Sequence, residues 1–229
     1  YDFSAMVPMQ LENSLEHMYK VRKLIVGGGV VSETLKEKIQ KVPTEIFATY
    51  GMTETITHIA VKKINKLGSG LQQNFYKLLP KIEISLDNRG CLIINAPKLA
   101  SEIIVTNDLV RINDKASFEW LGRFDSVINS GGIKLIPEQI ERKLSKLIKQ
   151  RFFVSSEKDN LLGEKLVLVI EGQTENIVEK SLILKFLGNH DLKKFEIPKV
   201  IYFIENFVET TTQKIQRSKT MEIIGKLRA

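Results

Sequence analysis

Residues 23–55 read KLIVGGGVVSETLKEKIQKVPTEIFATYGMTET, and this stretch decides the predicted fold. The apolar run Lys23–Val26 predicts a strand that ends at three glycines, and Glu45–Ala48 predicts a second strand. Between them, Ser32 is placed to cap a helix over Glu33–Lys41. Strand, turn, helix and strand in this order favour parallel strands covered by a helix, which is an α/β layer.

The segments on either side of this stretch predict one further helix and a β-rich region. Apolar residues at helical spacing indicate a helix over Pro8–Tyr19. Alternating apolar residues around the polar turn Asp87–Gly90 indicate a β-hairpin, and a second antiparallel pair follows around Asn113-Asp114. The strands of these pairs are expected at Lys81–Leu86, Cys91–Asn95, Asp108–Arg111 and Ser117–Leu121.

A change of pattern after residue 122 predicts a second, α+β domain of about a hundred residues, enough for a core of its own. We expect a first domain over residues 1–122, a hinge at 123–125 and a small C-terminal domain over 126–229. Strands are expected at Val127–Asn129, Phe152–Ser155, Leu166–Ile170 and Val200–Ile204, and helices from Pro137, over Ile177–Leu187 and from about Ser218.

The composition is that of a globular protein, with 43% hydrophobic and 27% charged residues. No run of about 18 apolar residues occurs, so no membrane span is predicted. The single cysteine, Cys91, excludes an internal disulfide and a Cys-rich zinc framework. The single cysteine, together with the lack of a signal-peptide pattern in the first residues, favours a cytoplasmic location. Because the chain begins with Tyr1, we expect a fragment, a processed chain or a trimmed one.

The net charge of +7, from 34 Lys and Arg against 27 Asp and Glu, raises the question of a nucleic-acid partner. The basic residues are spread along the whole length, without a block of five or six like charges. A solvated basic surface is therefore favoured over a nucleic-acid interface.

The densest group of polar functional residues is Thr49–Thr55, directly after the second predicted strand. Loops at the carboxyl ends of strands are where open α/β sheets bind ligands. An aromatic ring can stack on a base, hydroxyls can bind a phosphate, and a carboxylate can hold Mg²⁺. Taken alone, the same residues are equally consistent with a capped helix start.

Tyr50-Gly51-Met52-Thr53-Glu54 resembles the signature of the adenylate-forming superfamily, which contains acyl-CoA synthetases, the adenylation domains of peptide synthetases and firefly luciferase. Further segments resemble its other motifs in the family's order and cover essentially the whole chain. They are Gly27–Gly29, Asn107–Leu109, Gly122–Asp125 continuing through Ser130–Lys134 to Pro137–Glu141, and Thr210–Arg217. Within the superfamily, Thr49–Ala60 looks most like the o-succinylbenzoate–CoA ligases of menaquinone synthesis, with another aryl- or acyl-CoA ligase as the alternative.

The resemblance implies a nucleotide site with ATP or AMP and Mg²⁺. Tyr50 would stack on the adenine, Thr53 would bind the α-phosphate and Glu54 would hold the Mg²⁺. Asp108 would accept both ribose hydroxyls, and Arg123 would bind ribose or phosphate. The glycines expected at the nucleotide are Gly28, Gly29 and Gly51.

The resemblance also implies a second set of residues for catalysis and for coenzyme A. Lys214 would stabilise the charge that develops between carboxylate and phosphate during adenylation. Asp125 would be the hinge of a domain rotation, after which Gly131 and Gly132 would lie beside pantetheine. Lys134 follows them and is expected at a contact with the large domain or on the surface.

His58 is expected either to line the acyl pocket or to be satisfied by its neighbours, because a helical segment would place it on the face of Glu54. His17 and His190 show no ligand spacing with it, so no histidine metal site is predicted.

The sequence departs from the family pattern at several points. Asn107 and Gln213 stand where the family has glycine, and Val208 where it has proline. The Ser/Thr/Gly-rich phosphate loop of the family has no counterpart in these residues, so we expect the 229-residue chain alone not to adenylate an acid. The sequence thus leaves two main hypotheses, an acid–CoA ligase and a non-catalytic module that keeps AMP contacts.

Overall fold

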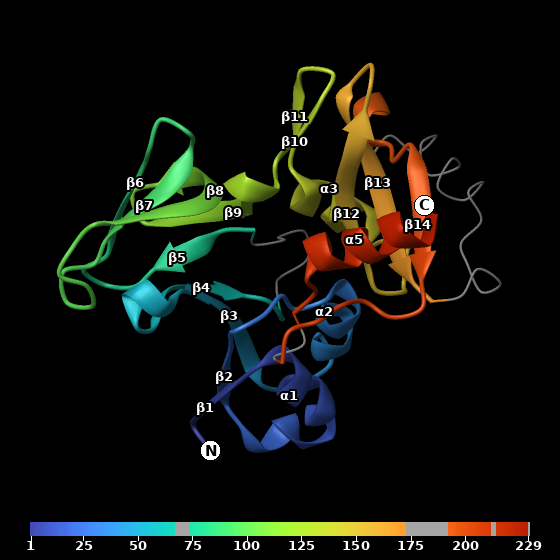
Figure 1. Ribbon diagram of the computed structural model, residues 1–229. Helices are drawn as coiled ribbons and strands as arrows, with labels where there is room; N and C mark the ends of the chain where they lie inside the picture. Colours follow the sequence, from blue (N-terminus) through green and yellow to red (C-terminus); the bar gives the residue numbers. More distant parts are fainter. Residues whose placement is uncertain (67–73, 173–191, 212–213, 229) are drawn as a thin grey trace. The chain divides into compact units, whose positions relative to one another are not determined.

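The computed structural model describes residues 1–66, 74–172, 192–211 and 214–228 (Figure 1). The chain divides into two compact units, Tyr1–Leu121 and Gly122–Ala229. The division falls next to the segment for which a hinge was predicted, and the hinge itself stays a prediction.

Within the described residues, the first unit is built on one sheet of nine strands in the order β1-β2-β3-β4-β5-β9-β8-β7-β6. β1, β2 and β3 run parallel, and β3, β4, β5 and β9 pair antiparallel, as do β6, β7 and β8. The strands are β1 (Phe3–Met6), β2 (Lys23–Val26), β3 (Glu45–Gly51), β4 (His58–Lys63), β5 (Tyr76–Leu78), β6 (Glu83–Leu86), β7 (Cys91–Asn95), β8 (Ile104–Asp114) and β9 (Ser117–Arg123).

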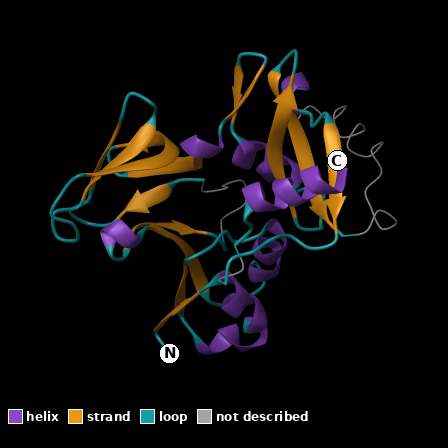
Figure 2. Ribbon diagram, viewed as in Figure 1, coloured by secondary structure: helices purple, strands orange, loops and turns teal. Residues whose placement is uncertain are grey.

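The helices of the first unit gather beside its parallel strands (Figure 2). They are α1 (Pro8–Asn13), a 3-10 helix over Leu15–Lys20 and α2 (Glu33–Ile39). Their apolar residues share one core with β2 and β3, including Leu11, Leu35 and Ile46. The predicted α/β layer is therefore confirmed, and the Ser32 hydroxyl accepts a hydrogen bond from Leu35 N–H (3.1 Å), as expected of a cap.

The prediction of one helix over Pro8–Tyr19 was wrong. Ser14 ends α1 with φ −114° and ψ 8°, and the chain continues as a 3-10 helix. Asparagine and serine compete for backbone hydrogen bonds and so favour helix ends, which accounts for the break after Asn13.

One buried amide fixes where β3 begins, and hence where the loop after β3 lies. Asn65 Oδ1 accepts from Ile46 N–H (2.8 Å), while Asn65 Nδ2 donates to the carbonyls of Ile39 (3.2 Å) and Thr44 (2.7 Å). Asn65 is fully buried. A buried amide whose groups are all paired holds its partners in one arrangement, because each broken bond would leave an unsatisfied polar group.

The strands predicted in the β-rich half of the first unit are present, although β6 begins at Glu83 instead of Lys81 and β8 extends beyond the predicted Asp108–Arg111 at both ends. β6 and β7 make the expected hairpin, with Glu83 opposite Asn95 and Leu86 opposite Leu92. Asp87 closes the loop by accepting from the backbone N–H groups of Arg89 (2.8 Å) and Cys91 (2.9 Å). The sequence did not show that this half continues the sheet of the parallel strands through β4 and β5.

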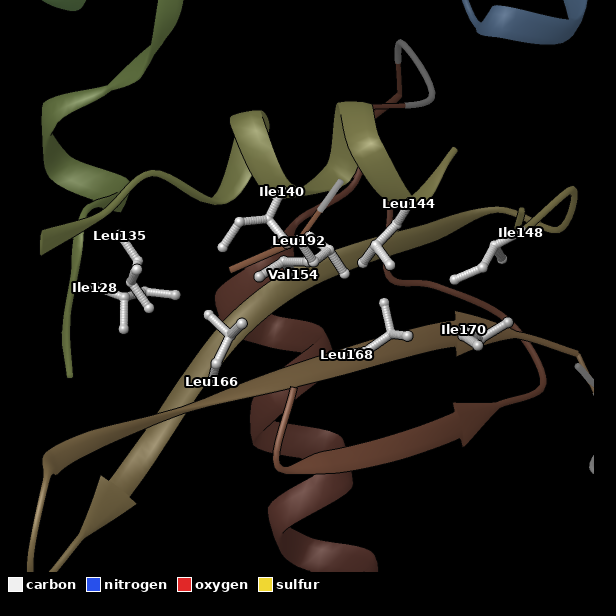
Figure 3. Close-up of a cluster of buried hydrophobic side chains, with 10 residues drawn as sticks. All are labelled: Ile128, Leu135, Ile140, Leu144, Ile148, Val154, Leu166, Leu168, Ile170 and Leu192. Atoms are coloured by element: carbon white, nitrogen blue, oxygen red, sulfur yellow. The ribbon is translucent and has the colours of Figure 1, made fainter. Parts of the chain in front are cut away.

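The second unit packs helices against a sheet of five strands, counted over its described residues. α3 lies across β12 and β13, and its Ile140 and Leu144 point toward Val154 and Leu168 of these strands (Figure 3). The elements are β10 (Ile128–Ser130), β11 (Ile133–Leu135), α3 (Pro137–Leu144), β12 (Phe152–Asp159), β13 (Gly163–Glu171), β14 (Val200–Ile204) and α5 (Arg217–Arg228), with 3-10 turns at Phe124–Ser126 and Lys194–Glu196.

Most predicted elements of the second unit are confirmed, with two qualifications. β11 was not predicted, because three residues beside a glycine pair are too short for a periodicity signal. The predicted helix over Ile177–Leu187 lies outside the described residues.

Candidate functional site

The signature segment forms a tight loop between two antiparallel strands. β3 ends at Gly51, a 3-10 turn covers Thr53–Thr55, and β4 begins at His58, which pairs with Gly51. Beyond this 3-10 turn the segment is not helical, so the condition under which Glu54 and His58 would share a helical face is not met. The strand pairing, and not helical periodicity, places His58 beside the loop.

Gly51 is required by the closeness of the two strands. A Cβ atom at this position would lie 2.6 Å from His58 Cα and 2.6 Å from the Thr57 carbonyl oxygen. With the strands this close, the exposed side chains of Thr53 and Glu54 project from the intervening turn. The loop borders an open hollow of about 570 Å³, whose lining includes Gly28, Thr49, Met52 and His58.

The glycine turn after β2 lies against the end of β3. A Cβ atom on Gly27 would sit 2.4 Å from Thr49 Oγ1, and Gly28 takes a positive φ of 78°. The structure thus brings Gly28 to the same hollow as Gly51 and Thr53, as expected if these residues serve one ligand. Gly29 is exposed beside Pro8 and does not line the hollow.

Tyr50 and Asp108, both predicted for the nucleoside, are in direct contact although 58 residues separate them. The Tyr50 hydroxyl donates to Asp108 Oδ2 (2.6 Å). Trp120 Nε1 donates to Asp108 Oδ1 (3.1 Å), and Asp108 is buried, with 7% of its surface exposed.

An aromatic cluster packs against the ring of Tyr50. The Tyr50 ring lies 5.1 Å from the Phe118 ring and 5.8 Å from the Tyr76 ring, measured between centroids. Lys62 Nζ lies 4.5 Å above the Tyr76 ring. Edge-to-face and cation–π contacts at these distances are favourable and hold the Tyr50 ring in one orientation.

Glu54 suits a magnesium ion that also binds phosphate. Mg²⁺ is usually held by one or two carboxylates together with phosphate oxygens and water, and not by a cage of protein ligands. Among the described residues, no group of three or more His, Cys, Asp or Glu side chains could hold a metal. The exposed carboxylate of Glu54, next to the Thr53 hydroxyl, therefore fits a metal that arrives with a nucleotide.

In the second unit, Arg123 and Asp125 bind each other. Arg123 Nε and Nη2 donate to the two carboxylate oxygens of Asp125 at 3.2 and 2.8 Å. These hydrogen bonds lower the pKa of Asp125 below its usual value. Arg123, which was expected to bind ribose or phosphate, is thus bound to Asp125, which was expected to act as the hinge.

Gly131 and Gly132 form the two-residue turn of a hairpin between β10 and β11. Both take positive φ, 59° and 80°, which suits glycine in such turns. A Cβ atom on Gly132 would meet nothing within 4 Å. The turn geometry therefore accounts for both glycines, while Lys134 lies exposed on β11.

Lys214 is presented at the end of a short two-stranded ladder. Thr210 N–H donates to the Lys214 carbonyl (2.9 Å), Lys214 N–H donates to Thr210 Oγ1 (3.0 Å), and Glu209 pairs with Ile215. The Lys214 side chain is exposed. Residues 212 and 213, between the two arms, lie outside the described residues.

Arg217 anchors this ladder to α3 and β12. Its Nη2 donates to Glu141 Oε2 (3.0 Å), and its Nη1 lies 3.8 Å from Glu138 Oε1. Glu141 Oε1 also accepts from Val154 N–H (2.7 Å). Burial raises the pKa of Glu141 and of Glu138 above the usual carboxyl value, although Arg217 acts in the opposite direction on both.

Glu138 Oε2 is buried without a hydrogen-bond partner. This oxygen lies close to the backbone of Gly122, because a Cβ atom added to Gly122 would be 2.4 Å from it. A buried carboxylate oxygen without a donor favours the protonated form, because burial penalises the charge.

The curated proteins to which this chain is similar include several ligases. The chain is 25% identical to the 2-succinylbenzoate–CoA ligase of Listeria monocytogenes over 223 residues, covering 88% of this chain and 46% of the relative. It is 26% identical to the enzyme of the same name from Haemophilus influenzae, covering 97% of this chain and 52% of the relative. The chain is homologous to AMP-forming acid–CoA ligases.

Solved structures show the same relation. The acyl-CoA synthetase (AMP-forming)/AMP-acid ligase II-like protein of Dyadobacter fermentans is 36% identical, with a TM-score of 0.53 over 98% of this chain and 65% of the other. The O-succinylbenzoate coenzyme A synthetase of Bacillus subtilis, solved with ATP and magnesium, is 19% identical, with a TM-score of 0.78 over 96% of this chain and 51% of the other. No protein-family model matches the chain.

This ligase homologue spans about half the length of the curated relatives that it matches, 46% of the Listeria enzyme and 52% of the Haemophilus enzyme. Among its described residues, no helix is both long enough and apolar enough to cross a membrane.

Sequence reasoning gave no role to three residues that support candidate site residues within one unit or the other. The first is Trp120, which donates a hydrogen bond to Asp108, and the second is Thr55, which is buried inside the signature loop. The third is Glu141, which accepts a hydrogen bond from Arg217. Trp120 could have been found, because it follows Phe118 at the two-residue spacing that puts side chains on one face of a strand. The other two depend on tertiary contacts and left no local pattern.

We expect Tyr50→Phe to destabilise the first unit. The change leaves the buried Asp108 carboxylate with one donor fewer, and a hydrogen bond to a charged group is worth about 1.5–3 kcal/mol. Urea unfolding followed by the fluorescence of Trp120, the only tryptophan, measures the loss. Tyr19→Phe is the matched control, since the Tyr19 ring is 66% exposed. Equal midpoints for the two variants would contradict the role of the Tyr50 hydroxyl.

We also expect the stability of the second unit to fall as pH rises through the raised pKa of Glu138. The folded state holds this proton more tightly than the unfolded state, so the stability that it contributes is complete at low pH and is lost as the carboxyl ionises. Glu138→Gln should flatten this fall, because a neutral amide does not titrate. Urea unfolding from pH 5 to 8, read by pulse hydrogen exchange on β12 and β13, tests it. Glu222→Gln, at an exposed position of α5, should keep the wild-type slope.

Proposed function

We propose that this chain provides the nucleotide-binding loop and the catalytic lysine of an ATP-dependent acid–CoA ligase, with o-succinylbenzoate as the acid. The observation that carries the proposal is the contact between Tyr50 and Asp108 beside the Thr53–Glu54 turn. Base, ribose, phosphate and metal would each meet a suitable group there. The relatives that cover most of this chain include several 2-succinylbenzoate–CoA ligases, which supports this acid. The proposed setting is the cytoplasm.

In the first half-reaction, a carboxylate oxygen of the acid attacks the α-phosphorus of ATP, and pyrophosphate leaves. Negative charge builds up between the two anions, so catalysis needs positive charge and hydrogen-bond donors at that place. We assign the ammonium of Lys214 and the hydroxyl of Thr53 to this role, and Glu54 would hold a Mg²⁺ that would supply Lewis-acid charge at the phosphates. Asp108 would hold the ribose, and Tyr50 the adenine.

In the second half-reaction, the thiolate sulfur of coenzyme A attacks the acyl carbon, and AMP leaves with the electron pair of the bond to oxygen. The attacking group now comes from another direction, so the small domain would have to turn. The division of the chain beside Asp125 is consistent with such a turn. Release of Arg123 from Asp125 is the local change that would let the guanidinium reach a nucleotide.

For the acid we propose the hollow beside the signature loop. Met52 and Ile56 supply apolar surface, while Thr57 and His58 supply polar groups. His58 Nδ1 lies 3.2 Å from Thr57 Oγ1, which fixes the orientation of the ring. An aromatic acid with a second polar end would find both kinds of contact there.

A panel of acids tests the substrate. With the protein expressed from its native gene, o-succinylbenzoate should give faster CoA-thioester formation than plain fatty acids of similar length. His58→Ala should raise the KM for the acid more than the KM for ATP, because the ring would touch only the acid. His17→Ala, at an exposed position, is the control. Preference for a fatty acid would overturn the acid assignment, and an effect confined to ATP would overturn the role of His58.

Substitution of Lys214 should affect the two half-reactions to different extents. Lys214→Ala should slow acid-dependent ATP–pyrophosphate exchange by about 100-fold or more, as loss of a transition-state charge donor does. Thioester formation from supplied acyl-adenylate should remain nearly unchanged, because that step needs no charge between carboxylate and phosphate. Single-turnover kinetics of each step measures both effects.

Lys219→Ala is the control for this experiment, since Lys219 is also exposed and lies in α5, five residues along the chain. Equal slowing of both half-reactions by Lys214→Ala would show that Lys214 maintains the fold and does not act in adenylation. Thioester formation from acid, ATP and coenzyme A at a normal rate, without any pyrophosphate exchange in the wild type, would refute the acyl-adenylate route.

A further inference from the structure

Thr55 is fully buried in the middle of the signature loop, unlike its exposed neighbours Thr53 and Glu54. Its hydroxyl oxygen accepts a hydrogen bond from Met52 N–H (3.1 Å). The same oxygen lies 2.7 Å from the Thr57 carbonyl and 3.0 Å from the Met52 carbonyl. A hydroxyl has one proton to donate, and the shorter distance assigns it to Thr57.

The hydroxyl therefore joins the two ends of the loop. Met52 directly follows β3, and Thr57 directly precedes β4. Thr53 and Glu54 lie between these two points, on the exposed side of the turn. The positions of Thr53 and Glu54 therefore depend on the loop backbone that the Thr55 hydroxyl holds together.

The backbone next to Thr55 is strained. Ile56 has φ 62° and ψ −42°, and Thr57 N–H donates to the Thr55 carbonyl at 2.6 Å. Together these describe a γ-turn with positive φ at its central residue, which is a rare and strained form. The strain is unusual for a β-branched residue such as Ile56, whose side chain is 79% exposed and offers little packing in return.

Strained backbone persists where the surroundings fix it, and it concentrates at functional sites. Here the fixing contacts are the Thr55 hydroxyl and the close approach of Gly51 to His58. The strained residue Ile56 directly follows the buried Thr55 and lines the same hollow as Thr53.

We propose that Thr55 is the positioning residue of this site: its buried hydroxyl holds the Met52–Thr57 loop closed, so that the Thr53 hydroxyl and the Glu54 carboxylate are held at a fixed separation for a phosphate and its Mg²⁺. This inference rests on the proposed function. Thr55 touches neither substrate nor metal and acts only through the loop backbone.

The test compares two substitutions of similar size. Thr55→Val keeps the shape and removes the hydroxyl, whereas Thr55→Ser keeps the hydroxyl and removes a methyl group. In the protein expressed from its native gene, Thr55→Val should lower acid-dependent pyrophosphate exchange by about 100-fold, because a displacement of about 1 Å at a reacting group can cost that much. It should also raise the Mg²⁺ concentration needed for half-maximal rate, while Thr55→Ser should restore most of both.

The other half-reaction and a remote threonine are the controls. Thioester formation from supplied acyl-adenylate should be affected far less by Thr55→Val. Thr34→Val, at an exposed position of α2, should leave both steps unchanged. Equal loss in Thr55→Val and Thr55→Ser, or equal slowing of both half-reactions, would overturn the positioning role.

Hydrogen exchange on the 229-residue chain separates this inference from the proposed function. The amides of Met52 and Ile56, which bond to Thr55 Oγ1 and to the Thr53 carbonyl, should exchange faster in Thr55→Val and not in Thr55→Ser. Unchanged exchange would overturn the inference even in an active ligase. Absence of pyrophosphate exchange in the wild type would refute the proposed function, and the amide exchange alone would then decide whether Thr55 fixes the loop.

Discussion

The hydrogen bond from the Tyr50 hydroxyl to the buried Asp108 carboxylate is the constraint on which the candidate site depends. A buried carboxylate needs donors, and here they come from two strands that are not neighbours of each other, β3 and β9. Satisfying Asp108 therefore fixes how the parallel strands and the β-rich strands of one sheet meet. The predicted nucleoside residues are brought together by the same interaction that joins the two halves of the first unit.

In the second unit, a positively charged guanidinium takes the place that the Asp108 carboxylate has in the first unit. Arg217 is held by Glu141 and lies near Glu138, so one guanidinium faces two partly buried carboxylates. Desolvation by burial raises the pKa of both glutamates, and the charge of Arg217 opposes this rise. The exposed Lys214 lies next to the Glu209–Ile215 bridge, and Arg217, two residues after Ile215, is bound to Glu141 of α3.

Much of the fold could be predicted from local pattern. The β2–α2–β3 unit and the β6–β7 hairpin follow from periodicity, a serine cap and a polar turn, each of which acts within a few residues. The helix predicted over Pro8–Tyr19 was wrong because apolar spacing is the same for an α-helix and for an α-helix that continues as a 3-10 helix. The pairing of β4 with β5 and of β5 with β9 had no local signal, since these contacts join segments distant in the chain.

By itself, the sequence determined which chemical groups are available and which family they resemble: Tyr50, Thr53, Glu54, Asp108 and Lys214, in that order along the chain. Only the tertiary structure decided which of them meet and what holds them. It placed Asp108 on the Tyr50 hydroxyl, and it showed that the signature segment is a strained loop tied by Thr55. The physical reason is range: caps, turns and periodicity act between near neighbours, whereas the satisfaction of a buried polar group depends on whichever distant strand the fold brings beside it.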